Sequence, residues 1–203
     1  MINIKKTKRE YLGILSRESF KTILDIGCSK GYMSRRFAKN KTKVIGVDKK
    51  CQTITEKNFK FIKKDILDFK FEKYDLVIAS LVLHRLKNSK AAHIVKKIQN
   101  STFDGGFNLL ICLSKKDCFA KSDYFYPTKD ELVRMYSDWK IIRLTEDFSE
   151  IEKHAGQKEH RHNLILCWLR KGELDYLREK NKLIQNPDLR HERQGLKAQR
   201  CHP

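Results

Sequence analysis

The stretch that most constrains the fold of this chain is TILDIGCSKGYMSRRFAKNKTKVIGVD, which runs from Thr22 to Asp48. Residues 23–26 form a short, mostly apolar run bounded by turn residues, which is typical of a buried parallel strand. A glycine-containing turn follows, then helix-forming residues at 34–40, and then a second apolar run that ends at Asp48. The order strand, turn, helix, strand predicts an α/β fold with a parallel sheet.

The turn itself predicts a ligand. Its glycines allow the backbone to approach a bound molecule closely, and the start of a following helix offers free N–H groups to an anion. A carboxylate roughly 20 residues further on, here Asp48, can accept hydrogen bonds from a ribose diol. Together these features indicate a nucleoside-bearing ligand at the carboxyl ends of the strands.

The spacing of the glycines separates two kinds of nucleotide site. A dinucleotide-binding turn has the pattern G-x-G-x-x-G, whereas this chain has G-x-x-x-G with Ser29 where a middle glycine is usual. Asp25, two residues before the first glycine, fits another family better. Asp-x-Gly-x-x-x-Gly followed by a strand that ends in an acid resembles motifs I and II of the class I S-adenosylmethionine (SAM)-dependent methyltransferases. A nicotinamide cofactor is the alternative.

The remaining chain supplies further elements in a regular order. Strands are predicted at residues 59–63, 74–80, 107–113 and 164–169, with another beginning at Trp139, and a helix is predicted over 89–101. Thr128 followed by Glu131 forms a capping box before a second helix. Only about ten residues separate Asp48 from the next strand, fewer than the usual dozen of a crossover, so we expect a helix of one or two turns there.

Three segments carry a more specific resemblance: DGGFNLLI, then YPTKDELVRMYSDWKIIRLTED, then a basic hairpin and a strand that ends in LRK. They resemble the tellurite-resistance methyltransferases of the TehB type, over roughly residues 24–171. The resemblance implies a three-layer, Rossmann-like class I methyltransferase fold. Its seven-stranded, mostly parallel sheet would end in an antiparallel C-terminal hairpin.

The resemblance also implies roles for individual residues. Asp48 would hold the ribose hydroxyls of SAM, Asp65 would accept from the adenine amino group, and the backbone N–H of Ile66 would reach the ring. The turn would hold the amino-acid end of the cofactor, and Ser80 would lie beside the methyl group. The complete predicted cofactor set is Asp25, Gly27, Cys28, Ser29, Gly31, Asp48, Lys49, Asp65, Ile66 and Ser80.

Four residues are candidates for contact with the methyl acceptor. His84 follows the fourth strand and is interpreted either as a general base or as a partly buried histidine at a helix entry. His160, Arg161 and His162 lie in the basic hairpin, where they would hold an anionic substrate or form only an exposed basic surface. Alternation along a strand points Cys167 away from the two histidines, so we predict no metal site.

Composition limits the partners. The chain has 44 Lys and Arg against 25 Asp and Glu, a net charge of +19, which favours anionic partners and keeps nucleic acid open. No apolar run approaches the ~20 residues of a transmembrane helix, and the six scattered cysteines read as reduced thiols. We therefore expect a cytoplasmic protein without a membrane partner, whereas the oligomeric state stays open.

The sequence thus predicts three regions: an N-terminal helical segment over 1–20, a methyltransferase domain over 21–171, and a basic C-terminal extension over 172–203. The expected reaction transfers a methyl group from SAM, by in-line displacement, to a small anionic or soft acceptor such as a chalcogen oxyanion or a thiol. An RNA methyltransferase and a SAM-binding protein without catalytic activity are the alternatives.

Overall fold

The computed structural model describes residues 18–39, 41–50, 54–153 and 158–172. By its contacts the chain divides into two units, Met1–Lys171 and Gly172–Pro203, and every helix and strand described below belongs to the first. The predicted N-terminal helix and C-terminal extension lie almost wholly outside the described residues, so both stay predictions.

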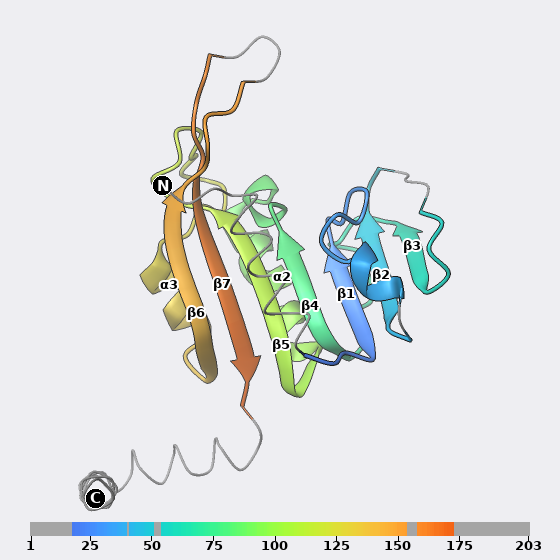
Figure 1. Ribbon diagram of the computed structural model, residues 1–203. Coiled ribbons are helices and arrows are strands. Elements are labelled where there is room, and N and C mark those ends of the chain that lie inside the picture. Colours follow the sequence, from blue (N-terminus) through green and yellow to red (C-terminus); the bar gives the residue numbers. More distant parts are fainter. Residues whose placement is uncertain (1–17, 40, 51–53, 154–157, 173–203) are drawn as a thin grey trace, which may run out of the picture. The chain divides into compact units, whose positions relative to one another are not determined.

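The central feature is a seven-stranded sheet with the strand order β3-β2-β1-β4-β5-β7-β6 (Figure 1). Strands β1 to β5 pair in parallel, whereas β7 lies antiparallel to both β5 and β6. This confirms the predicted sheet with its antiparallel C-terminal hairpin. The strands are β1 (Thr22–Ile26), β2 (Lys43–Asp48), β3 (Phe59–Lys63), β4 (Tyr74–Ser80), β5 (Thr102–Leu113), β6 (Trp139–Phe148) and β7 (Asn163–Lys171).

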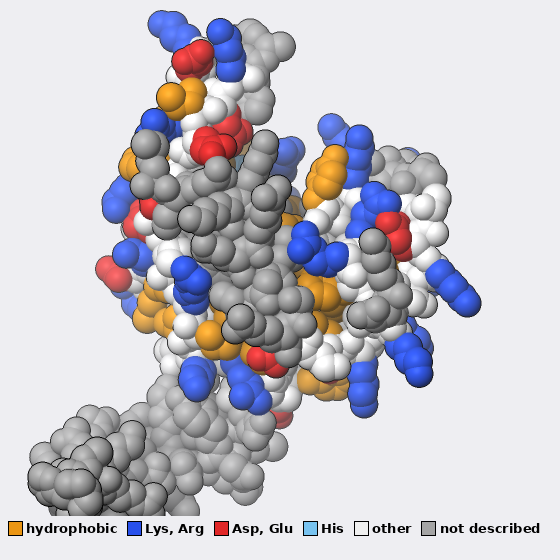
Figure 2. Space-filling model, viewed as in Figure 1, with side chains coloured by type: hydrophobic (Ala, Val, Ile, Leu, Met, Phe, Trp, Pro, Cys, Tyr) orange, Lys and Arg blue, Asp and Glu red, His pale blue; other side chains and the backbone are white. Residues whose placement is uncertain are grey.

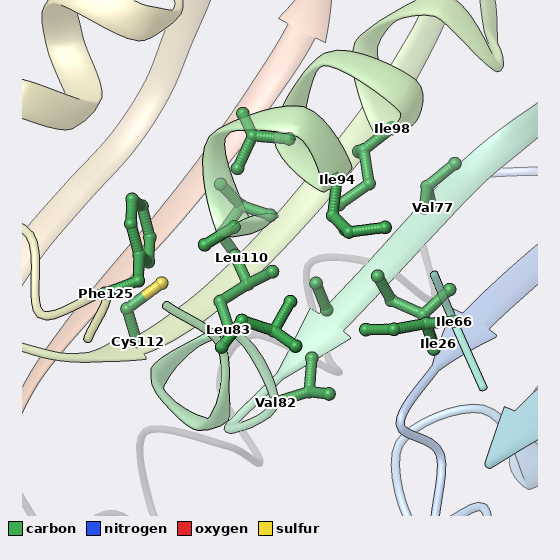
Figure 3. Packing of buried hydrophobic residues seen from close by; sticks show 14 of the residues in the cluster. Ile26, Ile66, Val77, Val82, Leu83, Ile94, Ile98, Leu110, Cys112 and Phe125 are labelled. Atoms are coloured by element: carbon green, nitrogen blue, oxygen red, sulfur yellow. The ribbon is translucent and has the colours of Figure 1, made fainter. Parts of the chain in front are cut away.

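Successive side chains of a strand point to opposite sides of the sheet, so each strand contributes to a buried cluster on either face. Leu24 of β1 belongs to one buried cluster and Ile23 to another. The first cluster packs under α2 (Asn88–Asn100) and α3 (Lys129–Met135). Figure 3 shows Ile94 and Ile98 of α2 beside Val77 of β4, and all three side chains are buried.

The second cluster lies under the segment that follows the glycine turn. There Phe20 packs edge-on against Phe107 of β5, and Phe107 stacks on Trp168 of β7 with ring centroids 4.8 Å apart. Met33 and Ala38 complete this face near η1 (Arg35–Lys39). Both faces of the sheet therefore carry buried apolar side chains, as in other α/β folds.

Three local predictions differ from the structure. The helix expected at 34–40 is the short 3₁₀ helix η1, and at its start the N–H groups of Ser34 and Arg35 both donate to the carbonyl of Gly31. Between β2 and β3, the described residues 49–50 and 54–58 contain bends and turns but no helix. Strand β5 begins at Thr102, five residues before the predicted start, because a register shift against β4 admits Gly105 in a left-handed conformation.

Predictions for the C-terminal half hold closely. The Thr128 hydroxyl accepts from the N–H of Glu131, whose carboxylate in turn accepts from the N–H of Thr128, so the capping box is confirmed. The two arms of the hairpin between β6 and β7, residues 149–153 and 158–162, extend beyond the sheet (Figure 1). They project past the edge where the parallel strands β1 to β5 end, which is the edge that carries the site.

Candidate functional site

A pocket of about 770 Å³ opens at the carboxyl ends of β1, β2 and β4. This is where open parallel sheets bind ligands, since neighbouring crossovers leave to opposite faces at that point. The pocket is lined by eight of the ten residues that the sequence predicted for the cofactor: Asp25, Gly27, Cys28, Ser29, Asp48, Lys49, Ile66 and Ser80.

The turn at the pocket rim needs glycine at both ends. Gly27 has φ +65°, and a Cβ atom there would lie 2.4 Å from Cγ2 of Val82. Gly31 has φ +70° and would meet the side chain of Arg35 at 2.7 Å. Ser29 between them is also left-handed, with φ 48°, a conformation that is costly for a residue with a side chain.

The carboxylate of Asp48 fixes this turn to the end of β2. It accepts one hydrogen bond from the N–H of Ser29 and another from the N–H of Lys50, each 2.9 Å long. Each of its oxygens keeps a second lone pair, so Asp48 can still accept from hydroxyl groups of a ligand in the pocket.

Asp25 is the one acid buried beneath the turn. It accepts a 2.6 Å hydrogen bond from the Ser34 hydroxyl. Burial raises the pKa of Asp25 to about 7; the hydrogen bond from Ser34 offsets part of this rise, and the charge of Asp48 adds a smaller rise. Asp25, which lines the pocket, therefore changes charge near neutral pH.

Asp65 and Gly31 do not line the pocket. The carboxylate of Asp65 is paired with the ammonium of Lys49 at 2.7 Å and accepts from the N–H of Leu67. Burial alone would raise the pKa of Asp65, but the hydrogen bonds from Lys49 and Leu67 and the charges of Lys49 and Lys90 together outweigh burial, so the pKa is lowered. Ile66, next in the chain, is buried in the pocket wall.

Several pocket residues lie beyond the strand ends, in segments that carry no recognisable motif. The segment after β4 bends back over the pocket at Leu81, which is left-handed with φ 54°. Arg36 and Arg85 place two guanidinium groups in the lining, and burial lowers the pKa of Arg36. The missed residues are Tyr32, Met33, Arg36, Lys50, Leu81, Val82, Arg85 and Leu86.

A second group of polar side chains gathers where β5 ends and β7 begins. The rings of His160 and His162 lie 5.0 Å apart, and Phe119 contacts both. Nδ1 of His162 is 2.9 Å from Oδ2 of Asp117, whose side chain is fully buried. Sequence reasoning predicted that the two histidines point together but missed Asp117, which no motif marks.

His84 belongs to the same neighbourhood. It lies in η2 (Leu83–Arg85), and its ring centroid is 6.1 Å from that of Tyr126. Burial lowers the pKa of His84 to about 4, as do the charges of Arg85 and His162, whereas the charge of Asp117 raises it. His84 is thus neutral at physiological pH, and its buried Nδ1 has no hydrogen-bond partner among the described residues.

Arg161, the fourth predicted acceptor-site residue, differs from its neighbours. Its described contact is through the backbone, whose carbonyl lies 3.6 Å from the thiol of Cys118. His154 falls outside the described residues. Among the residues that the structure describes, no group of three or more His, Cys, Asp or Glu side chains could hold a metal ion. Within the same part, no helix is long and apolar enough to cross a membrane.

The strand order, the antiparallel β7 and the pocket position define the fold of the class I SAM-dependent methyltransferases. Solved structures with the same fold include TehB from Haemophilus influenzae, with a TM-score of 0.65 and 20% identity over 81% of this chain and 61% of that one. Another is the N-methyltransferase NodS from Bradyrhizobium japonicum WM9 in complex with S-adenosyl-L-homocysteine. It has a TM-score of 0.63 and 15% identity over 84% of this chain and 89% of that one.

Residues 3–166 match the family model described as tellurite resistance protein TehB, so the chain belongs to the TehB family. A curated relative, a probable S-adenosyl-L-methionine-dependent methyltransferase TehB from Haemophilus influenzae (strain 10810), is 25% identical over 149 residues. That match covers 64% of this chain and 50% of the relative. The chain therefore spans about half the length of the curated relatives it matches.

Proposed function

We propose that this protein transfers a methyl group from SAM to a small anionic or soft acceptor, a chalcogen oxyanion or a thiol. The observation that carries the proposal is the position of the pocket: eight residues expected from a SAM-binding motif surround one space at the carboxyl edge of the sheet. Membership of the TehB family supports the same activity, and its name puts tellurite among the acceptors to test.

The pocket residues fit the cofactor by chemistry. Asp48 would accept from the ribose hydroxyls, as its unused lone pairs allow. Ile66 would contact the adenine ring, and the turn from Gly27 to Gly31, of which residues 27–29 line the pocket, would hold the amino-acid end. Arg36 and Arg85, which the sequence analysis missed, would add positive charge for the carboxylate of the cofactor.

One predicted cofactor contact needs a rearrangement. Asp65 can accept from the adenine amino group only through lone pairs that Lys49 and the N–H of Leu67 leave unused. Because Lys49 itself lines the pocket, a ligand that enters there would meet this ion pair. We therefore assign Asp65 to the adenine end of the pocket together with Lys49.

The cofactor, when bound, supplies a methyl group already activated by a sulfonium. The protein then has to align the acceptor with that methyl group and exclude water. Ser80 lines the pocket at the end of β4, and the histidines and Asp117 lie where the neighbouring β5 ends. An acceptor held by His160 and His162 would therefore enter from the β5 side.

The experiment that tests this function is methyl transfer from labelled SAM to a panel of tellurite, selenite, small thiols and RNA. Label in a volatile or thioether product supports the proposal.

Label in RNA alone would favour the RNA alternative, for which the specific observation is the net charge of +19. On the face that Figure 2 shows, however, Lys and Arg side chains are spread rather than gathered. SAM binding without transfer to any acceptor would indicate a non-catalytic SAM-binding protein.

A further inference from the structure

Asp117 and His162 form a carboxylate–imidazole pair that the class I motifs do not include. Asp117 lies in the segment between β5 and α3, and His162 directly precedes β7, 45 residues away. Asp117 is held from three sides: Oδ2 accepts from the N–H of Asn163 as well as from His162, and Oδ1 accepts from the N–H of Phe119. All these contacts are 2.9 Å long, so the carboxylate has a fixed orientation.

The pairing determines which nitrogen of His162 carries the proton. A carboxylate only accepts, so the Nδ1 that lies 2.9 Å from Asp117 must be the donor. The neutral ring then presents Nε2 with its lone pair, as a base requires. Within the described part of the chain, no hydrogen bond to that Nε2 is found. The side chain is 20% exposed, enough to meet a ligand.

The pair also lies beside the proposed methyl-transfer site. Strands β4 and β5 are neighbours in parallel, with Ser80 opposite Ile111. The N–H of Leu81, which lines the pocket, donates to the carbonyl of Ile111. His84 connects the two regions. It follows the pocket residue Val82 by two positions, and the charges of Asp117 and His162 both shift its pKa. The pair thus lies at the same edge of the sheet as the pocket, on the side of β5.

We infer that His162, oriented by Asp117, removes the proton of a thiol acceptor during methyl transfer. The inference rests on the proposed function and narrows its acceptor class. As the S–H bond breaks, the proton passes to Nε2 of His162. The sulfur lone pair forms the new bond to the methyl carbon, and the bond from that carbon to the sulfonium sulfur breaks. A methyl thioether and S-adenosylhomocysteine leave, and His162 returns its proton to water.

This role follows from matching the base to the nucleophile. An oxyanion such as tellurite already carries negative charge and needs only cations near it, whereas a thiol is a strong nucleophile only as thiolate. An imidazole that a buried carboxylate orients, with Nε2 placed to accept a proton, suits the second case, whereas tellurite has no proton that must be removed. His162 would be a catalytic residue, and Asp117 a positioning residue that acts through it.

The test compares two thiols of equal size, one mostly ionised at the assay pH and one mostly protonated. For His162→Gln, we expect kcat/KM to fall roughly 100-fold with the protonated thiol, the usual contribution of a general base, and far less with the ionised one. Asp117→Asn keeps the side-chain volume, and its kcat/KM with the protonated thiol should fall at least about tenfold. The exposed His93 on α2 provides the control, His93→Gln, which should match the wild type.

A second readout needs no turnover. Nitrogen-15 NMR of the wild-type protein should show the His162 proton on Nδ1, and a proton on Nε2 alone would contradict the pairing. Equal losses with both thiols, no loss with either, or turnover of tellurite but of no thiol would overturn the inference while leaving the methyltransferase function intact. Failure of the wild type to bind SAM in calorimetry would instead overturn the proposed function, and this inference with it.

Discussion

The carboxylate of Asp48 at the end of β2 accepts a 2.9 Å hydrogen bond from the backbone N–H of Ser29 in the glycine turn after β1. This bond joins the two motifs from which a nucleoside site was inferred, and it holds Ser29 at φ 48°. The acid therefore has two roles, since it shapes the turn and also offers its remaining lone pairs to the pocket.

Replacing Ser29 with glycine should stabilise the protein. A left-handed conformation strains serine but not glycine, and the N–H that donates to Asp48 is retained, so we expect a gain of about 0.5–1 kcal/mol in the free energy of unfolding. Urea denaturation measures it. The matched control is Ser89→Gly in the first turn of α2, which should lose about 0.5 kcal/mol. If Ser29→Gly also lowered the free energy of unfolding, the turn would not be strained at this position.

Replacing Gly27 with alanine should destabilise the protein. The new Cβ would lie 2.4 Å from Cγ2 and 2.6 Å from Cβ of Val82, and φ is +65°. We expect a loss of about 2 kcal/mol or more, together with weaker SAM binding, because Val82 lines the pocket. Thermal unfolding and calorimetry test the two effects. An alanine variant as stable as the wild type would show that the turn has another conformation.

The pH dependence of stability should report on Asp25. The folded-state pKa of about 7 lies above the ordinary value of 3.8, so the folded protein holds a proton that the unfolded chain releases. Stability must therefore fall as pH rises from about 4 to about 7, and then level off.

Asp25→Asn should remove this component of the pH dependence. The free energy of unfolding of the variant should therefore rise by a few kcal/mol relative to that of the wild type between pH 4 and pH 8. Denaturant titrations at both pH values test the difference between the two proteins, which cancels the other titrating groups. A difference that does not change with pH would show that Asp25 is already ionised in the folded state at pH 4.

Asp65 and Asp68 offer a test of the adenine end of the pocket. Asp65→Ala should weaken SAM binding roughly tenfold, the effect of about one charged hydrogen bond. Asp68→Ala should leave it unchanged, since Asp68 is exposed, whereas Asp65 is paired with Lys49 of the pocket lining. Equal affinities for both variants would remove Asp65 from the cofactor set.

The sequence predicted the strands well because each is a short apolar run with clear boundaries, as at β3 and β4, whose bounds match the prediction. It failed where tertiary contacts decide. The residues after Gly31 have helical propensity, yet they form only a short 3₁₀ helix. Strand β5 starts early because Gly105 and Gly106 sit inside a bulge against β4 rather than in a turn.

The residues of the candidate site likewise fall into those that the sequence predicted and those that it did not. Local spacing identified the turn and Asp48, because glycines and an acid at strand ends are visible in the sequence. Arg36 and Arg85 were not, since each lies in a short 3₁₀ helix that no motif marks, and Asp117 was not, since it reaches its site by packing against a segment that is distant in the sequence. Asp117 meets His162 across 45 residues, and only the antiparallel pairing of β5 with β7 brings them together.

The central claim, that this pocket binds SAM through Asp48, is tested most directly by calorimetric titration with SAM, S-adenosylhomocysteine and NADH. Asp48→Asn serves as the test variant because one oxygen remains to accept from Ser29, and Asp138→Asn, on an exposed residue between α3 and β6, serves as the control. We predict micromolar binding of both sulfur nucleosides, none of NADH, and roughly 100-fold weaker binding for Asp48→Asn alone. No binding of either sulfur nucleoside by the wild type, or equal binding by Asp48→Asn, would contradict the account.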